Sequence, residues 1–204
     1  MVPANFPDAW MAVTKGGLPM SSAQRRTLMT MDEFIAFEDA SETKHEFLGG
    51  HVYAMTGGSI AHARLIRRLL RILDTGAEIQ DCEAFVSDAK LRIGDIASFY
   101  PDVMVCCDPT DDDPRHRERP CLIVEVLSPS SIERDRETKL AAYTNLSWLK
   151  AYLIIDPLQP EVEVHTRARS GDMAWAKPTI YGVGESFVLP CPDGLILEVD
   201  ALYA

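Results

Sequence analysis

The chain of 204 residues is 47% apolar and 25% charged, which is typical of one soluble globular domain and excludes a disordered or fibrous protein. Its formal net charge of −11 argues against a general nucleic-acid coat, because phosphate binding is driven largely by lysine and arginine. An enzyme with an acidic metal-binding centre remains compatible with this charge, and without an apolar run long enough to cross a bilayer we expect a cytoplasmic protein.

The first elements follow from capping and turn residues. Residues 1–28, with scattered prolines and a glycine pair, are predicted to form a flexible N-terminal arm ahead of a single domain at 29–204. Thr30 and Glu33 fit a capping box that opens a helix. Gly49 and Gly50 lie between two alternating segments and predict a hairpin over 45–55, because glycines supply the positive φ angles of a tight turn.

A second helix is predicted from Ser59 to about Leu73, with one apolar side and one basic side. The arginines of the basic side are either a solvated face or phosphate contacts that position a nucleic acid without reading its sequence. They stand at i, i+3, i+4 and i+7, as Arg64, Arg67, Arg68 and Arg71.

Beyond the second helix we expect short strands with one interrupting helix. The strands are predicted over 83–87, 90–93, 99–107, 121–127, 151–156, 161–166, 173–180 and 195–199, and the helix over 128–143. The apolar 121–127 run is typical of a strand that is covered on both faces. This order predicts an α/β (α+β) domain with a mixed β-sheet flanked by helices.

The cysteines show no metal-binding spacing. There are five of them, an odd number, and they include no C-x-x-C pair. Cys106 and Cys107 are neighbours in an apolar run, where a strand would point them to opposite faces. We expect all five to be small buried hydrophobic residues of a reducing compartment rather than zinc ligands. They are Cys82, Cys106, Cys107, Cys121 and Cys191.

Two acids lie in or beside apolar strands. Asp102 opens one apolar run, and Glu125 is flanked by valines in the middle of another. A buried charge is costly unless something pairs with it, so Glu125 lies in a buried ion pair or shares a cation with Asp102. Asp102 alone would be an ordinary strand-start acid. Acids at matching heights on neighbouring strands point the same way, which predicts a divalent-metal site.

Several segments carry a resemblance to a known family: 100–102, 123–130 and 45–50, with His62, Asp135, Lys139 and Tyr143. Through them the chain, from about Met29 onward, resembles the Uma-type putative restriction endonuclease family of the PD-(D/E)XK nuclease superfamily. The resemblance implies a restriction-endonuclease-like fold, with 29–204 as a nuclease-like domain that binds Mg²⁺ (or Mn²⁺) through Asp102 and Glu125. It also implies Glu46 as a third, more peripheral metal carboxylate and His62 as a helix-start site residue.

The chain departs from the superfamily pattern at one position. A lysine is expected two residues after the second acid, where this chain has Leu127. Lys139 could replace it as a catalytic residue, because Asp135, Lys139 and Tyr143 lie at i, i+4 and i+8 on one face of the predicted helix, and Asp135 and Lys139 are paired charges. The ordinary alternative for that pair is a surface ion pair. Likewise, Glu46 could be an exposed hairpin acid, and His62 a local cap or packing residue.

These observations favour a metal-dependent endonuclease that hydrolyses phosphodiester bonds in DNA. Asp102, Glu125 and Lys139 would be its catalytic residues. The family resemblance also implies a homodimer, because many restriction-type nucleases pair up to cut two strands. The alternative is a catalytically inactive nuclease-fold module that binds nucleic acid or a protein partner, which Leu127 and the acidic charge favour. A third hypothesis is a hydrolase of a small phosphorylated molecule.

Overall fold

The structure is a computed structural model that describes residues 28–55, 57–128, 134–168 and 174–204, with the side chains of 134–136 excepted. The predicted N-terminal arm therefore lies outside the described residues, apart from Leu28. No helix in the described ranges is long and apolar enough to span a membrane.

A six-stranded sheet in the order β10-β9-β8-β7-β6-β3 forms the centre of the molecule. Its described strands pair antiparallel except for β7 and β8, which run parallel, so the predicted mixed sheet is confirmed. The strands are β3 (Glu83–Val86), β6 (Val103–Cys106), β7 (Leu122–Val126), β8 (Ala151–Ile155), β9 (Val162–Thr166) and β10 (Thr179–Tyr181).

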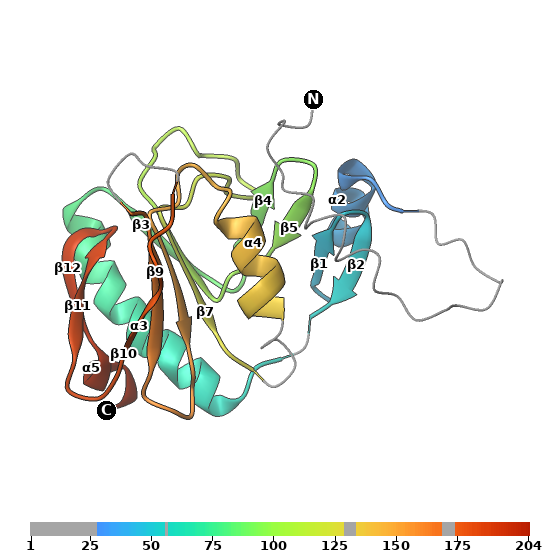
Figure 1. Cartoon of the computed structure of the whole chain (residues 1–204). Helices are drawn as coiled ribbons and strands as arrows, with labels where there is room; N and C mark the ends of the chain where they lie inside the picture. The colour runs from blue at the N-terminus through green and yellow to red at the C-terminus, as the bar shows by residue number, and fades with distance from the viewer. Residues whose placement is uncertain (1–27, 56, 129–133, 169–173) are drawn as a thin grey trace.

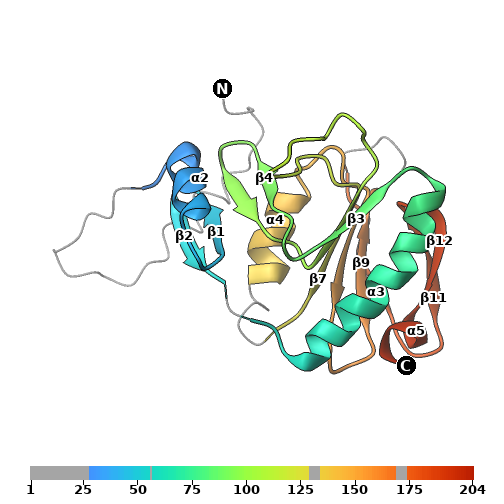
Figure 2. The same ribbon diagram turned by 180° about the vertical axis from the view of Figure 1, so that it is seen from behind.

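Helices cover both faces of this sheet. The long helix α3 (Ile60–Ile79) lies behind it and the short α4 (Leu140–Tyr143) in front, as Figures 1 and 2 show from opposite sides. Alternate residues of β7 supply the two cores: Val124 and Val126 pack with the leucines of α3, whereas Ile123 packs with Tyr143 of α4. Every residue of β7 and β8 is buried, as predicted for strands covered on both faces.

A smaller sheet, in the order β2-β1-β5-β4, stands beside α4. Its strands are β1 (His45–Leu48), β2 (His51–Ala54), β4 (Leu91–Ile93) and β5 (Ala97–Phe99), and α2 (Met31–Asp39) packs on it through stacked Phe34 and Phe47 rings. The predicted capping box at Thr30 and the predicted hairpin are both confirmed. Gly49 and Gly50 adopt φ angles of 55° and 91° in the turn.

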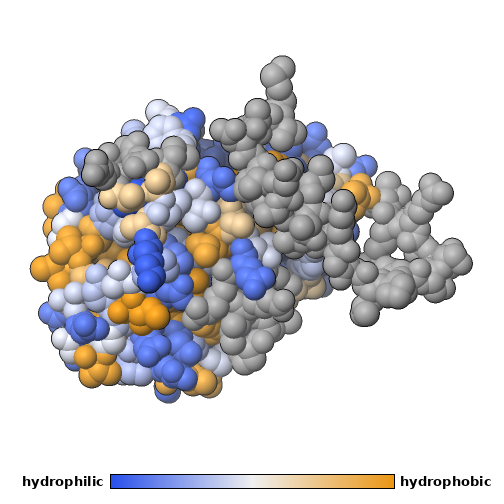
Figure 3. Space-filling view, viewed as in Figure 1, coloured by the Kyte–Doolittle hydropathy of each residue, from blue (hydrophilic) through white to orange (hydrophobic). Residues whose placement is uncertain are grey.

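The C-terminal hairpin of β11 (Ser186–Pro190) and β12 (Asp193–Glu198) leads into α5 (Val199–Tyr203) and packs on α3. Its outer side is apolar: Val188 and Ile196 are exposed, and orange patches lie over this hairpin on the left of Figure 3. Sequence periodicity predicted a strand only over 195–199 and missed β11, because Pro190 and Pro192 suggest a loop there.

The predicted strand over 99–107 is wrong at its start. Phe99 ends β5 in the small sheet, and Val103 begins β6 in the large one. Pro101 lies between them and donates no backbone hydrogen bond, so the chain leaves one sheet and enters the other at Tyr100–Asp102. In the predicted helix over 128–143, the described part is a π-helix, η1 (Arg134–Lys139), followed by α4.

The expectation that all five cysteines are unpaired hydrophobic residues is wrong for four of them. Cys82 is bonded to Cys107 and Cys121 to Cys191, whereas Cys106 is a buried free thiol. The spacing gave no sign of these pairs, because each joins residues 25 or 70 positions apart.

Candidate active site

The acids predicted for the site come from three elements that meet beside α4. Glu46 lies on β1 of the small sheet and Glu125 on β7 of the large one, while Asp102 ends the link between β5 and β6. The β6–β7 register pairs Val103 with Val124, so Asp102 lies opposite Glu125 on the neighbouring strand. The fold therefore places the two predicted acids on adjacent strands.

Asp102 is fixed against the next strand by a backbone hydrogen bond. The Val126 N–H donates to Asp102 Oδ2 over 2.7 Å, and His62 Nε2 lies 3.1 Å from the same oxygen. Since a carboxylate only accepts, the imidazole donates from Nε2. Both donors hold the carboxylate in one orientation directly before the start of β6.

His62 stands in the first turn of α3, where its backbone N–H also donates to the N-cap hydroxyl of Ser59. Gly58 leaves space for the ring, because a Cβ at that position would lie 2.6 Å from His62 Nδ1. The cap that was the ordinary alternative for His62 is present, and the ring in addition contacts Asp102.

Lys139 joins the other two acids. Its ammonium lies 2.9 Å from Glu46 Oε1 and 3.0 Å from Glu125 Oε1. The side chain of Lys139 is only 6% exposed, and those of Glu46 and Glu125 are 3% exposed. Lys139 is therefore not part of a surface helical ion pair, and Glu46 is not an exposed hairpin acid. The partner considered for Lys139 in the sequence, Asp135, has its side chain outside the described residues.

Tyr143, one helical turn after Lys139, completes the contacts of Glu125. Its hydroxyl donates to Glu125 Oε1 over 2.9 Å, and its ring packs edge-on against Phe99, over which the Lys139 ammonium also lies. Burial and the nearby Glu125 charge raise the pKa of Tyr143 well above its ordinary value of 10.0, so the hydroxyl keeps its proton. Sequence reasoning placed Tyr143 on the face of Lys139 but gave it no role.

Replacing Tyr143 with phenylalanine is expected to lower the free energy of unfolding near neutral pH by about 1.5–3 kcal/mol, the worth of one hydrogen bond to a charged group. Because the pKa of Tyr143 is raised in the folded protein, the stability that its hydroxyl contributes is fully present below pH 10.0. It is lost as the pH rises, because the tyrosine of the unfolded chain ionises first. Urea unfolding from neutral pH to about pH 11 should therefore show a shallower alkaline decline for the variant than for the wild type. Parallel declines would contradict this placement of the hydroxyl.

Glu38 on α2 forms a second buried cluster that sequence reasoning missed. Its carboxylate accepts hydrogen bonds from the His45 N–H over 2.9 Å and from the Tyr100 hydroxyl over 2.8 Å. Burial and this carboxylate raise the pKa of Tyr100. Because His45 precedes Glu46 and Tyr100 lies two residues before Asp102, Glu38 holds together the two segments that present these acids.

Lys139 supplies the ammonium that the superfamily pattern places two residues after the second acid. Leu127, at the position of the superfamily lysine, is buried in the core beneath α4. The ammonium beside Glu125 comes instead from Lys139, at the end of η1 on the same side of the sheet. The structure thus brings the sequence-predicted substitute to the second acid from another element.

The oxygen donors suit a hard divalent cation in type. The buried carboxylates of Glu46 and Glu125 converge on one point, and the positive charge of the Lys139 ammonium lies there between them. In the described part of the chain, however, the only group of three or more His, Cys, Asp or Glu ligand atoms within 4.8 Å of one another is Cys107, Cys121 and Cys191. Glu46, Asp102 and Glu125 therefore do not lie as a closed trio of ligands.

The predicted basic face of α3 is divided. Arg64, Arg67 and Arg71 are exposed. Arg68 is half-buried, and its Nη1 donates to the Leu202 carbonyl of α5 over 3.1 Å. Arg68 thus joins α3 to the C-terminal helix, and the solvent-facing cations are the other three.

The fold is restriction-endonuclease-like, a mixed β-sheet flanked by helices. A crystal structure described as a putative nuclease from Anabaena variabilis ATCC 29413 superposes with a TM-score of 0.69 over 86% of this chain and 97% of that one, at 17% identity. Residues 31–200 match the family described as Uma2, putative restriction endonuclease, and the chain belongs to that family.

Two curated relatives come from Synechocystis sp. (strain ATCC 27184 / PCC 6803 / Kazusa). The uncharacterized protein slr1290 is 34% identical over 146 residues, which are 71% of this chain and 77% of that protein. The uncharacterized protein sll1609 is 34% identical over 159 residues, 76% of this chain and 89% of its own length. The family resemblance expected from the sequence is therefore confirmed.

Proposed function

We propose that the protein is a Mg²⁺-dependent endonuclease that hydrolyses phosphodiester bonds in DNA, with Asp102, Glu125 and Lys139 at its centre. The observation that carries the proposal is the Lys139 ammonium held between two buried carboxylates at the end of β7, next to Asp102 on the adjacent strand. Membership of a family of putative restriction endonucleases supports the same chemistry.

Asp102, Glu125 and the more peripheral Glu46 would hold the cation. When bound, Mg²⁺ polarises the scissile phosphate and lowers the pKa of a bound water. Hydrogen bonds from the Val126 N–H and His62 keep Asp102 oriented. The Tyr143 hydroxyl stays protonated and donates a hydrogen bond to Glu125. Lys139 adds a fixed positive charge in a buried site, where charge developing on a phosphate is stabilised most.

A nuclease-fold module without catalysis is the second candidate. Leu127 removes the lysine of the superfamily pattern, and the Lys139 ammonium neutralises the two buried glutamates within the protein. Exposed Arg64, Arg67 and Arg71 on α3 would then provide phosphate contacts for binding alone.

The full chain, incubated with plasmid DNA, linear duplex, single-stranded DNA or RNA, separates the two candidates. We expect DNA cleavage with Mg²⁺ or Mn²⁺, none with a chelator, and calorimetric binding of Mn²⁺. DNA binding without cleavage would favour the inactive module, and failure to bind metal and to cleave any substrate would overturn the proposed function. Sedimentation of the same samples checks the proposed homodimer.

A further inference from the structure

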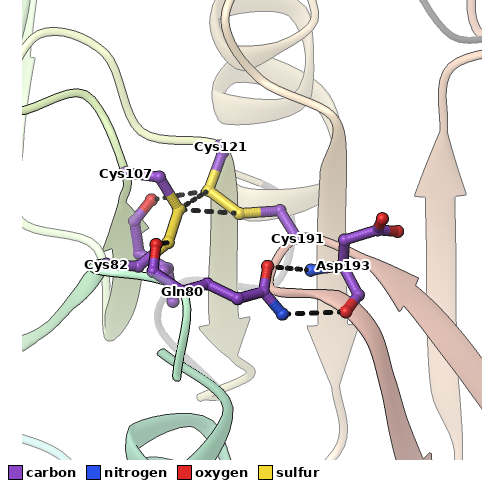
Figure 4. The surroundings of a disulfide bond; sticks show 7 residues. Gln80, Cys82, Cys107, Cys121, Cys191 and Asp193 are labelled. Atoms are coloured by element: carbon purple, nitrogen blue, oxygen red, sulfur yellow. Dashed lines mark hydrogen bonds between the residues drawn. A yellow bond between two sulfur atoms is a disulfide. The ribbon is translucent and has the colours of Figure 1, made fainter. Parts of the chain in front are cut away.

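Four cysteines meet at the edge of the large sheet that lies opposite the acids (Figure 4). Cys82 directly precedes β3, Cys107 directly follows β6, and Cys121 directly precedes β7. Because β3, β6 and β7 pair antiparallel, these positions lie at one edge, whereas Asp102 and Glu125 lie at the other ends of β6 and β7. The cysteine cluster is therefore separate from the proposed nuclease site.

The fourth cysteine arrives from the C-terminal hairpin. Cys191 follows β11 and is bonded to Cys121. The Gln80 side chain holds this hairpin to the α3–β3 connection: its Nε2 donates to the Asp193 carbonyl, and its Oε1 accepts from the Asp193 N–H, both over 2.8 Å. The four sulfurs thus come from four separate segments that other contacts already keep together.

The two disulfides also touch each other. Cys107 Sγ lies 3.4 Å from Cys121 Sγ and 3.6 Å from Cys191 Sγ, and these three sulfurs all lie within 4.8 Å of one another. Cys82 Sγ is bonded to Cys107 Sγ but does not belong to this group of three. Two disulfides that only stabilise the fold need not lie in contact with each other. A tetrahedral metal site needs four sulfurs around one point, and with Zn–S distances of about 2.3 Å its edges are about 3.8 Å. The Cys107, Cys121 and Cys191 sulfurs already lie together, and the Cys82 side chain would turn toward them once its bond to Cys107 is open.

Backbone carbonyl groups around the cluster can bind the thiols that form when the disulfides are reduced. The Gln80 and Val105 carbonyl oxygens lie 3.5 Å and 3.3 Å from the sulfurs of Cys82 and Cys121, as acceptors for S–H groups once the disulfides are open. Cys107 is half-buried, which gives a reductant or an ion access to the cluster. Cys106 is excluded from it, and burial raises the pKa of that thiol to about 12.

We propose that Cys82, Cys107, Cys121 and Cys191, when reduced, form a closed four-thiolate site for one Zn²⁺ ion. Two molecules of a dithiol each donate two electrons and two protons to one disulfide and close their own disulfide, which leaves four cysteine thiols. Binding of one Zn²⁺ replaces the thiol protons, which pass to solvent. Thiolates are the soft ligands that select Zn²⁺ over Mg²⁺, so this site and the acidic site take different metals.

The test titrates the reduced, chelator-treated full chain with Co²⁺ as a spectroscopic probe and then with Zn²⁺. We expect one equivalent of Co²⁺ to give the thiolate charge-transfer and tetrahedral bands of a four-sulfur site, and Zn²⁺ to displace it. Cys191→Ser should weaken Zn²⁺ binding by at least about 100-fold, since a ligand is lost. The matched control, Cys106→Ser, changes a cysteine adjacent to the cluster and should bind like the wild type.

A second measurement does not depend on how well a variant folds. In the wild type, Zn²⁺ should slow alkylation of the four cluster thiols at least 10-fold, as peptide mapping by mass spectrometry resolves. The air-oxidised protein should give no cobalt bands. Absence of bands in the reduced wild type, unchanged alkylation with Zn²⁺, or equal losses in Cys106→Ser and Cys191→Ser would each overturn the proposal.

Discussion

Replacing Lys139 with methionine is expected to lower the free energy of unfolding by about 3–5 kcal/mol. The substitution keeps much of the side-chain volume but leaves Glu46 and Glu125 buried, facing each other, without their shared ammonium. Breaking a buried ion pair by removing one partner is strongly destabilising because the desolvated charge remains. The loss is measured as a lower urea midpoint at constant m-value.

Two comparisons identify the cause of this loss. Lys150→Met, on an exposed side chain, should stay within about 0.5 kcal/mol of the wild type. Adding Glu46→Gln and Glu125→Gln to Lys139→Met removes both stranded charges and should recover part of the stability. Millimolar Mn²⁺ should raise the midpoint of Lys139→Met more than that of the wild type. A loss below about 1 kcal/mol would contradict the buried ion pair.

Local patterns were sufficient for the elements that depend on neighbouring residues. The Thr30 capping box, the hairpin turn at Gly49 and Gly50 and the Ser59 cap of α3 each involve residues within three or four positions. Strand adjacency was also predictable for Asp102 and Glu125, because successive apolar strands tend to pair. These are the parts of the fold that the sequence predicted correctly.

Contacts between distant segments were not predictable in the same way. Glu46 reads as an exposed hairpin acid, and it is buried because the small sheet packs beside α4, which hairpin periodicity does not report. Glu38 has the same ordinary appearance on α2, although its carboxylate holds His45 and Tyr100. The site is thus assembled by tertiary packing around acids that local patterns assign to the surface.

The cysteines illustrate a different limit. Their separations carry no metal-binding motif, so reading along the chain assigned them to the core. Only the strand order shows that the start of β3, the end of β6 and the start of β7 share one edge. Cysteines placed directly before or after paired antiparallel strands are a signal that becomes readable once the sheet topology is known.

Asp102→Asn is expected to reduce metal-dependent DNA cleavage by about 1,000-fold, equivalent to about 4 kcal/mol of transition-state stabilisation. Asparagine keeps the shape and an acceptor oxygen for the Val126 N–H, so the fold should be retained. It removes the charge that would hold the divalent cation, and neutral amide oxygens are weaker ligands than carboxylates. Initial cleavage rates at saturating Mg²⁺, together with Mn²⁺ affinity by calorimetry, measure both effects.

The matched control is Asp95→Asn, which makes the same chemical change on a side chain that is 80% exposed in the β4–β5 turn. It should cleave at the wild-type rate, because an exposed pair with Arg92 contributes little. Glu125→Gln should lose activity as Asp102→Asn does, and combining the two should cost much less than the sum of the single losses, since residues that act as a unit are not additive. Wild-type cleavage by Asp102→Asn would show that Asp102 is not a metal ligand and that its carboxylate only joins β6 to β7 through the Val126 N–H.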